Sequence, residues 1–359
     1  MAVPASNVSA KRDSRIGPGV PDFPRRSVPL AGKSDGRTDD LNVTNTTPTA
    51  ENLSELHEPH WLNRAAFPAV SLGFFATQTA LAVSIYRGWN WTLVPLILIL
   101  SHFMHGMLIA FHEATHGLLR NTRRLNEVDG ILIGFFCLMS FSLYRAAHQT
   151  HHAHFATERD EELWPFVHPR IPRWARMLAA FLELTLGLLY TPFLLLRCFL
   201  RRGSPIRSRK VRRRIWAELA LTAAVWTCTL WAIARWNAWS YFLCMYFAPA
   251  YLAGNLQSWR KYIEHVGLTG STIKSATRSI VPESRLGRFF AFTLLHEPYH
   301  GVHHQQVGLS HAELPQFASS LQPTVPEEHP PYRSYRHALA DLISSLTDPR
   351  VGPQWRART

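Results

Sequence analysis

The chain has 359 residues and a formal net charge of +13, because 38 Lys and Arg residues outnumber 25 Asp and Glu residues. Such a charge could suit a nucleic-acid-binding protein, but much of it gathers at residues 201–214 (RRGSPIRSRKVRRR), beside long apolar runs. Basic segments next to membrane spans keep those segments in the cytoplasm, so we expect a membrane protein with no nucleic-acid partner. The four cysteines form no Cys-x-x-Cys pair, which excludes a zinc knuckle.

The two ends of the chain are polar. Residues 1–56 are rich in Ser, Thr, Asn, Asp, Pro and Gly and lack apolar clusters, so we expect a disordered tail there. Residues 321–359 are polar and proline-rich, and we expect a second tail with a short surface helix over residues 333–346. The membrane domain is therefore predicted over residues 57–320.

Two apolar segments open this domain. Residues 67–89 and 91–111 are each about 20 residues long, which suffices to cross a bilayer at about 1.5 Å per residue. The link between them is short enough only for a tight hairpin, and its two tryptophans are expected at the membrane interface. His102 and His105 lie within the second span, where we expect packed, hydrogen-bonded histidines.

Three short segments are rich in histidine. HEATH occupies residues 112–116, HQTHH occupies 148–152, and HEPYHGVHH occupies 296–304. Residues three and four positions apart share one face of a helix, and neutral imidazole is the commonest protein metal ligand. Three such faces brought together would make an all-imidazole metal site. The histidines that share these faces are His112, His116, His148, His151, His152, His300, His303 and His304.

The basic segment fixes the expected topology. It is followed by two apolar runs, 215–236 and 238–259, which form a second hairpin and return the chain to the cytoplasm. All three histidine segments lie on that side of the membrane only if neither the run at 130–143 nor the run at 174–200 crosses the membrane in a single pass. We expect both to lie on the membrane surface or to re-enter it, and the longer to break at Pro192.

The predicted fold class is thus an all-α integral membrane protein. It has about four transmembrane helices in two hairpins, with a cytoplasmic histidine-rich cap.

HEATH also matches the HExxH motif of zinc metalloproteases, in which His112 and His116 bind the metal and Glu113 is the general base. The second match, at residues 296–300, contains Pro298, which is poorly placed in a helix interior. A catalytic zinc takes three protein ligands and keeps one open position, whereas this chain offers at least eight histidines. A site with several metal ions explains that number better, and the zinc protease is kept as the second alternative.

The order and spacing of the three segments resemble the histidine boxes of the membrane fatty acid desaturase family, a superfamily that also contains carotenoid and alkane hydroxylases. The resemblance covers about residues 60–320. It includes YRAAH at 144–148, which is similar to the family's approach to its second box. It also includes RKYIEH at 260–265, which is similar to the segment after the last span and implies that His265 is a further ligand.

This resemblance implies an oxidoreductase that holds two iron ions and uses O2 as co-substrate. Introduction of a double bond into an acyl lipid is the leading prediction, and hydroxylation or ketolation of a lipid, carotenoid or alkane is the first alternative. The implied metal ligands are His112, His116, His148, His151, His152, His265, His300, His303 and His304.

The resemblance also implies a separate electron donor of the ferredoxin or cytochrome type. The active site is expected on the cytoplasmic face, in a bacterial inner membrane by preference and in the endoplasmic reticulum as the alternative. For Glu113 the more natural role is a hydrogen bond to a ligating imidazole. The roles of His154, His296, His311 and Asn255 stay open.

Overall fold

A computed structural model describes residues 59–358, so the expectation of a disordered tail over residues 1–56 lies outside the described residues. The described part is helical apart from one isolated bridge between Ile280 and Tyr332. Three helices are long and apolar enough to cross a membrane, or up to four if the bent pair α4–α5 counts as one span. The predicted all-α membrane fold is confirmed.

The first hairpin consists of α2 (Ala66–Arg87) and α3 (Leu93–His116), joined by the short turn η1 (Asn90–Thr92) and preceded by α1 (Trp61–Arg64). Trp91 in the turn is 82% exposed, as expected for a tryptophan at a membrane interface. The second helix continues without a break into the first histidine box. It stops at Gly117, whose φ of 76° lies in the left-handed region that glycine adopts without steric cost.

The second histidine box lies on the far arm of a bent pair. Helices α4 (Arg123–Phe136) and α5 (Phe141–Ala153) meet at an angle of 103°, so the run at 130–143 bends instead of crossing once as a straight helix. The Ser140 hydroxyl caps α5 by accepting from the amide of Leu143, and it donates to Glu218 at 2.7 Å. Through this carboxylate the bend is hydrogen-bonded to the helix that contains Glu218.

The run expected at the membrane surface forms two short helices, α6 (Arg173–Thr185) and α7 (Gly187–Leu200). The expected break at Pro192 is wrong, because Pro192 lies inside α7 and the chain breaks at Leu186 instead. A proline removes one helical hydrogen bond, and here that does not end the helix. The packing beside this break is close, since a Cβ on Gly187 would lie 2.3 Å from the carbonyl oxygen of Gly254.

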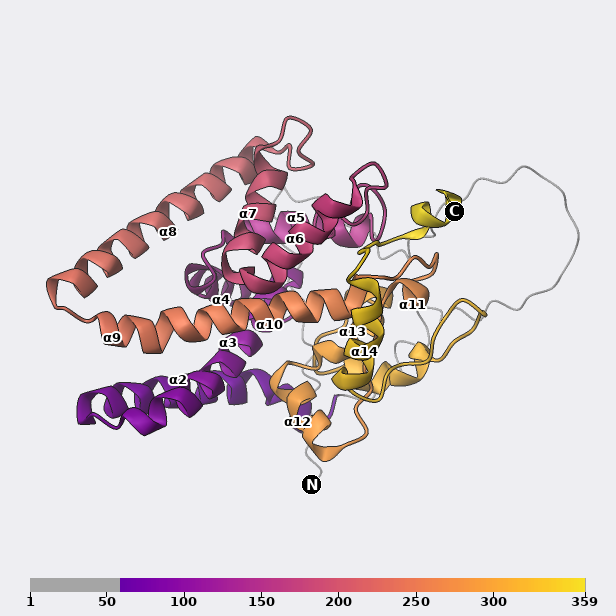
Figure 1. Ribbon diagram of the computed structural model, residues 1–359. Coiled ribbons are helices and arrows are strands. Elements are labelled where there is room, and N and C mark those ends of the chain that lie inside the picture. Colours follow the sequence, from indigo (N-terminus) through magenta and orange to yellow (C-terminus); the bar gives the residue numbers. More distant parts are fainter. Residues whose placement is uncertain (1–58, 359) are drawn as a thin grey trace, which may run out of the picture. The chain divides into compact units, whose positions relative to one another are not determined.

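The second hairpin starts with α8 (Arg209–Arg235), which carries the end of the basic segment. The return path is helical throughout, as α9 (Trp239–Phe242), the π-helical turn η2 (Leu243–Phe247) and α10 (Ala248–His265). Figure 1 shows α9 and α10 leading back from the tip of α8. The π turn interrupts the expected span at 238–259, and of the helices in this hairpin only α8 is long and apolar enough to cross a membrane.

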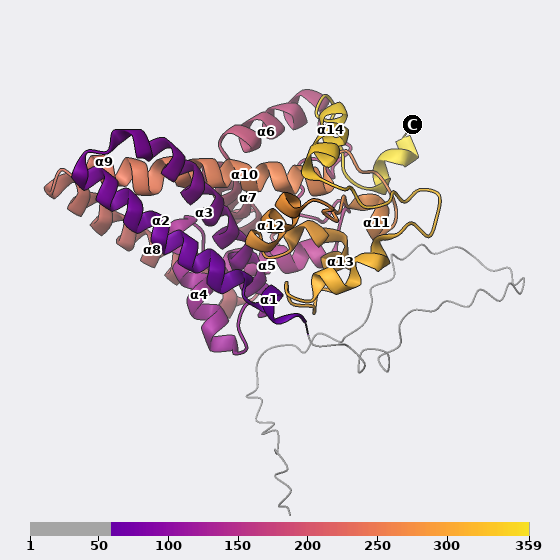
Figure 2. The ribbon, with the colours of Figure 1, turned by 90° about the horizontal axis from the view of Figure 1, so that it is seen from below.

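The C-terminal segment (residues 266–358) gathers around the end of α10, as Figures 1 and 2 both show. Its α14 buries Ala338 and Leu342, which join a core cluster with Tyr262 of α10. This packing places the third histidine box against the ends of α3, α5 and α10. The elements are α11 (Ile273–Ala276), α12 (Arg285–Thr293), η3 (Glu297–Tyr299), α13 (His300–Gln305), η4 (Leu314–Leu321), α14 (Tyr335–Ser345) and η5 (Pro353–Arg358).

Candidate metal centre

The nine histidines predicted as ligands converge in two adjoining groups. The ring centroids of His152 and His304, one from each group, lie 4.7 Å apart. The rings come from α3, α5, α10 and α13, so the site forms only when these four elements pack together. The first histidine cluster contains His112, His116, His148, His152 and His303. The second histidine cluster contains His151, His265, His300 and His304.

Within each cluster the Nε2 atoms point at one another. The Nε2 atom of His148 lies 3.0 Å from that of His116 and 2.9 Å from that of His152. The chain of contacts in the first cluster ends with His303, whose Nε2 lies 3.1 Å from that of His152. In the second cluster, Nε2 of His300 lies 2.9 Å from that of His265 and 3.0 Å from that of His304.

Buried carboxylates fix the tautomer of three of these histidines. Nδ1 of His148 lies 3.1 Å from Glu162, and Nδ1 of His151 lies 2.9 Å from Asp160. In the same way, Nδ1 of His300 lies 3.1 Å from Glu297. An ionised carboxylate only accepts hydrogen bonds, so in each pair Nδ1 carries the proton and Nε2 presents a lone pair to the cluster.

This arrangement fits metal ions. For a metal–nitrogen bond of about 2.1 Å, ligand atoms at right angles are about 3.0 Å apart and tetrahedral ligand atoms about 3.4 Å apart. The Nε2 spacings of 2.9–3.1 Å match the right-angled case. Lone pairs held this close in a buried site repel unless a cation lies between them. The donor set and spacing therefore suit ions of higher coordination number than a tetrahedral zinc.

Burial keeps the third-box imidazoles neutral. It lowers the pKa of His300 to about 4, even though the nearby Glu297 acts in the opposite direction. Burial likewise holds the pKa of His303 and His304 well below the ordinary value of 6.5. Imidazole binds a metal in its neutral form, so these three side chains are ready to act as ligands at neutral pH.

The remaining histidines lie outside both clusters. His296 stacks on His311, with ring centroids 6.0 Å apart, and His154 follows α5 as its C-terminal cap. His102 and His105 are hydrogen-bonded as expected, to Thr293 at 2.8 Å and to Gln257 at 3.1 Å.

Asn255 contacts the backbone, whereas Glu113 forms a further group of possible metal ligands with His112 and Glu297. Asn255 accepts a hydrogen bond from the Gly187 amide at 2.8 Å. Glu113 is fully buried, and one of its oxygens accepts from the His311 amide at 3.1 Å. Pro298 lies in the 3-10 turn η3, so residues 296–300 do not form the helix that HExxH requires.

The carboxylates that hold the histidines were not predicted from the sequence. Asp160 and Glu162 follow the second box closely, and Glu161 between them binds Arg197 at 2.9 Å and also Arg201. Arg260 donates to both Glu264 and Glu297 at 2.6 Å. An acidic run directly after a histidine box was the available signal, because buried acids need partners.

A cavity of about 60 Å³ lies beside the clusters, with room for a few water molecules. One wall is apolar and the other carries Glu183, Ser258 and Lys261. Five cluster histidines line it: His112, His148, His151, His265 and His300. The apolar lining is Leu108, Phe111, Leu163, Met139, Leu194 and Leu195. A small molecule in this cavity would touch both clusters.

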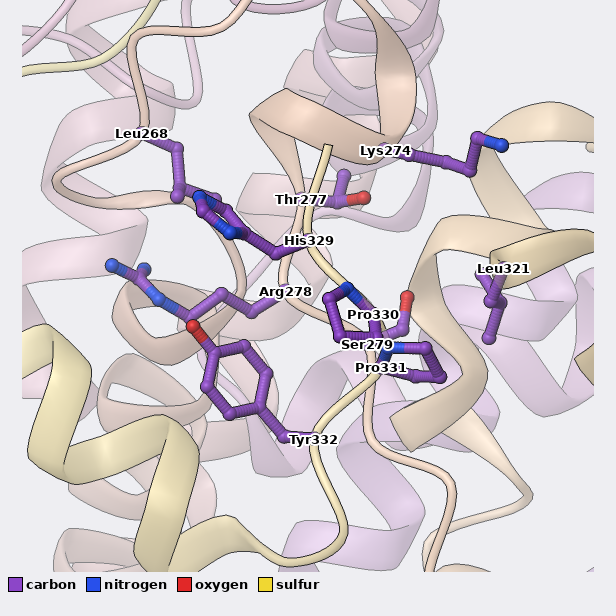
Figure 3. A pocket seen from close by; sticks show the side chains of 10 residues that line it. All are labelled: Leu268, Lys274, Thr277, Arg278, Ser279, Leu321, His329, Pro330, Pro331 and Tyr332. Atoms are coloured by element: carbon purple, nitrogen blue, oxygen red, sulfur yellow. The ribbon is translucent and has the colours of Figure 1, made fainter. Parts of the chain in front are cut away.

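A second pocket lies in the C-terminal segment, between the strand-like stretch at Arg278–Ser279 and the chain at Pro330–Tyr332 (Figure 3). Its volume of about 10 Å³ holds at most one water molecule. No cluster histidine lines it, so it is not the candidate site.

Comparison with known proteins agrees with this geometry. The sequence model of the family described as "Fatty acid desaturase" matches residues 89–336, which span all three histidine boxes and both clusters. No individually curated protein matches the chain. With three to four helices able to cross a membrane, the protein is an integral membrane protein. The chain belongs to the fatty acid desaturase family of oxidoreductases.

Proposed function

We propose that the protein is an oxygen-dependent desaturase that introduces a carbon–carbon double bond into a fatty acyl lipid, using two histidine-bound iron ions. The observation that carries this proposal is the convergence of nine imidazoles into two clusters with Nε2 spacings near 3.0 Å. Family membership implies an acyl substrate. The cavity that touches both clusters supplies a place for it.

Each cluster would hold one iron ion. The first would be bound by His112, His116, His148, His152 and His303, and the second by His151, His265, His300 and His304. Bound iron supplies the redox chemistry that activates O2. The overall reaction converts –CH2–CH2–, O2, two electrons and two protons into –CH=CH– and two molecules of water.

The chain's own residues position the substrate and exclude water. Phe111 and Leu195, each about 1% exposed, belong to the apolar wall that would hold one short stretch of an acyl chain against the histidines. Correct placement of the reacting atoms can supply a large part of the rate enhancement. The small volume of the cavity favours a chain that enters as a narrow hydrocarbon over a bulky ring system.

The electrons would come from a separate ferredoxin- or cytochrome-type protein. The basic segment at 201–214 supports a cytoplasmic face for the site, because basic segments beside membrane spans stay in the cytoplasm. We favour a bacterial inner membrane, with the endoplasmic reticulum as the alternative.

The test is a total lipid profile by mass spectrometry, from cells that express the wild type or His303→Ala together with an electron donor. His337→Ala is the matched control, because His337 is exposed on α14 and belongs to neither cluster. We expect lipids lighter by two hydrogens with the wild type and the control, and none with His303→Ala. Lipids heavier by one oxygen would show a hydroxylase instead. An unchanged profile with verified expression and a working donor would contradict both activities.

A further inference from the structure

Glu297 contacts both histidine clusters. Its Oε1 atom lies 3.1 Å from Nδ1 of His300 in the second cluster. Its Oε2 atom lies 3.5 Å from Nδ1 of His112 in the first cluster. All three residues are at most 3% exposed, and neither Oε2 nor the His112 Nδ1 atom makes a hydrogen bond. One carboxylate therefore faces the outer nitrogens of two predicted ligands that belong to different clusters.

The other buried carboxylates near the site each serve one cluster. Glu162 contacts His148 of the first cluster, and Asp160 contacts His151 of the second. Glu264 lies near His265 and His300, both in the second cluster, and Glu113 lies near His112 in the first. Among the described carboxylates, Glu297 alone lies within 4 Å of a histidine in each cluster.

The local backbone is strained in a way that places this carboxylate. Leu295 and His296, directly before Glu297, have φ angles of 48° and 55°, in the left-handed region that is sterically unfavourable for a residue with a Cβ. Full burial of Leu295 and a hydrogen bond of 2.7 Å from the His296 amide to the Ala291 carbonyl hold the turn. Strain of this kind persists where the surrounding structure fixes it, often at functional sites.

Arg260 fixes the orientation of the carboxylate. Its Nη1 atom donates to Oε1 of Glu297 at 2.6 Å, on the side that also accepts from His300. The guanidinium is 6% exposed and is itself held by Glu264. Oε2 is thereby left to face His112.

We propose that Glu297 is a positioning residue that sets the tautomer and orientation of one ligand in each cluster, so that binding of both metal ions depends on it. The inference rests on the proposed function, because it requires that both clusters bind metal. When Glu297 accepts from Nδ1 of His112 and of His300, the lone pairs of both residues are on Nε2, where the metal ions bind.

Replacing Glu297 by glutamine separates the effect of this residue on the first cluster from its effect on the second. Arg260 carries only donors, so it keeps the amide oxygen of the substituted side chain on its own side, beside His300. The amide NH2 then faces Nδ1 of His112, which becomes an acceptor and leaves the proton of the neutral ring on Nε2. Glu297→Gln is therefore expected to impair the first cluster only, whereas Glu297→Ala impairs both.

The experiment titrates metal-free protein in detergent with Co(II) alone and counts tight sites by optical absorption. Two controls define the loss of a single site: Glu162→Ala for the first cluster and Asp160→Ala for the second, since alanine removes the acceptor of Nδ1 in each case. Loss of a carboxylate partner typically weakens a metal site about 10- to 100-fold. We expect two tight sites in the wild type, one in each control, none in Glu297→Ala and one in Glu297→Gln.

Double variants identify the site that Glu297→Gln keeps. Adding Asp160→Ala should remove the remaining tight site, whereas adding Glu162→Ala should leave it. Thermal unfolding of each metal-free variant tests whether a loss is due to misfolding, and the nearly isosteric Glu297→Gln keeps the test decisive if Glu297→Ala unfolds. Two tight sites in Glu297→Gln, or a remaining site that Glu162→Ala removes, would overturn the inference. Absence of tight sites in the wild type would instead overturn the proposed function.

Discussion

At the scale of single residues, charges buried beside the site are paired with one another. Glu183 of α6 is fully buried and binds Lys261 of α10, and it also accepts from the Tyr262 hydroxyl at 3.0 Å. Both members of the charged pair line the cavity next to the clusters. An isolated buried charge is costly, so each depends on the other.

This pair gives the first prediction. Lys261→Met should destabilise the protein by about 3–5 kcal/mol, because it leaves Glu183 charged and buried without its cation. Lys261→Met combined with Glu183→Leu should recover most of that loss, since a buried ion pair can often be replaced by apolar side chains. Chemical unfolding in detergent measures both variants. A double variant no more stable than Lys261→Met would show that the pair is not the cause.

Much of the metal centre could be predicted at this scale, and the rest could not. Eight of the nine histidines were predicted as ligands because i, i+3 and i+4 spacing within each box is local information. His265 was predicted only from the resemblance of residues 260–265 to the desaturase family. The division of the nine into five and four was not predicted, because His151 and His152 are neighbours in sequence yet belong to different clusters. The carboxylates Asp160, Glu162 and Glu297 were missed as partners of His151, His148 and His300, which lie 9, 14 and 3 residues away in sequence. Spacing alone does not show how the chain after α5 and the turn η3 direct these acids at the rings.

At the scale of elements, the site depends on close contact between α7 and α10. Gly187 and Gly254 meet where the chain turns from α6 into α7, and a Cβ on Gly187 would also lie 2.4 Å from Oγ of Ser258. The Ser258 hydroxyl lines the cavity, and Thr191 of α7 lines it as well. The width of the cavity is therefore set partly by two glycines.

We predict that Gly187→Ala pushes α7 away from α10 and destabilises the protein by about 1–3 kcal/mol, the usual effect of overpacking. The matched control is Gly203→Ala, because a Cβ there would meet no atom within 4 Å. Thermal unfolding of the two variants and their desaturation rates give the comparison. Equal stability of both variants would mean that the close contact between α7 and α10 does not contribute to the stability of the protein.

A second element-scale feature lies in the C-terminal segment. Glu328 accepts from the Thr324 amide at 2.7 Å, from the Thr272 hydroxyl at 2.9 Å and from Lys274 at 2.9 Å. Burial acts to raise the pKa of Glu328, but these hydrogen bonds outweigh it and lower the pKa from 4.5 to about 2. The folded protein therefore favours the ionised form of this carboxyl group.

The sign of the pH dependence follows from that lowered pKa. The stabilisation from Glu328 is complete above pH 4.5 and is lost as the pH falls from 4.5 to about 2. Glu328→Gln should lower the free energy of unfolding by about 1–3 kcal/mol at pH 7. This gap in stability between the variant and the wild type should close as the pH falls from 4.5 to about 2. Thermal unfolding of both proteins across this range tests the prediction. A gap that stays constant with pH would contradict it.

At the scale of the whole molecule, the basic segment adjoins the metal centre. Arg201, at the start of this segment, binds Glu161, and the neighbours of Glu161 in sequence hold one histidine of each cluster. A negatively charged electron donor that docks on this segment would come close to both clusters. Complementary charge chiefly increases the rate of association.

We predict that Arg202→Glu combined with Arg207→Glu raises the KM for an acidic donor roughly tenfold at low salt and leaves kcat unchanged, because steering is lost. The effect should shrink as the salt concentration rises. Arg333→Glu combined with Arg336→Glu is the control, since these exposed arginines lie at the start of α14. Steady-state kinetics with a purified donor measure both pairs. A larger effect in the control pair would move the docking surface to the C-terminal segment.

The architecture as a whole was largely predictable from hydropathy and charge. The first hairpin, α8 and the bend at 130–143 follow from the lengths of apolar runs between polar ones. The division of the last span by a π turn and the break at Leu186 were not predicted, because the apolar pattern runs on through both positions and the local signal, Pro192, lies inside α7. The packing of α14 against Tyr262 was not predicted either, because it depends on contacts distant in sequence.

The metal content of the purified wild-type protein, measured by elemental analysis together with Mössbauer spectroscopy, is the sharpest test of the proposed di-iron centre. We predict two iron ions per chain, bound by nitrogen ligands, and no stoichiometric zinc. His303→Ala should lose iron from the first cluster and keep it in the second. One zinc ion per chain, or a single iron ion that His303→Ala does not affect, would contradict a di-iron centre built from these nine histidines.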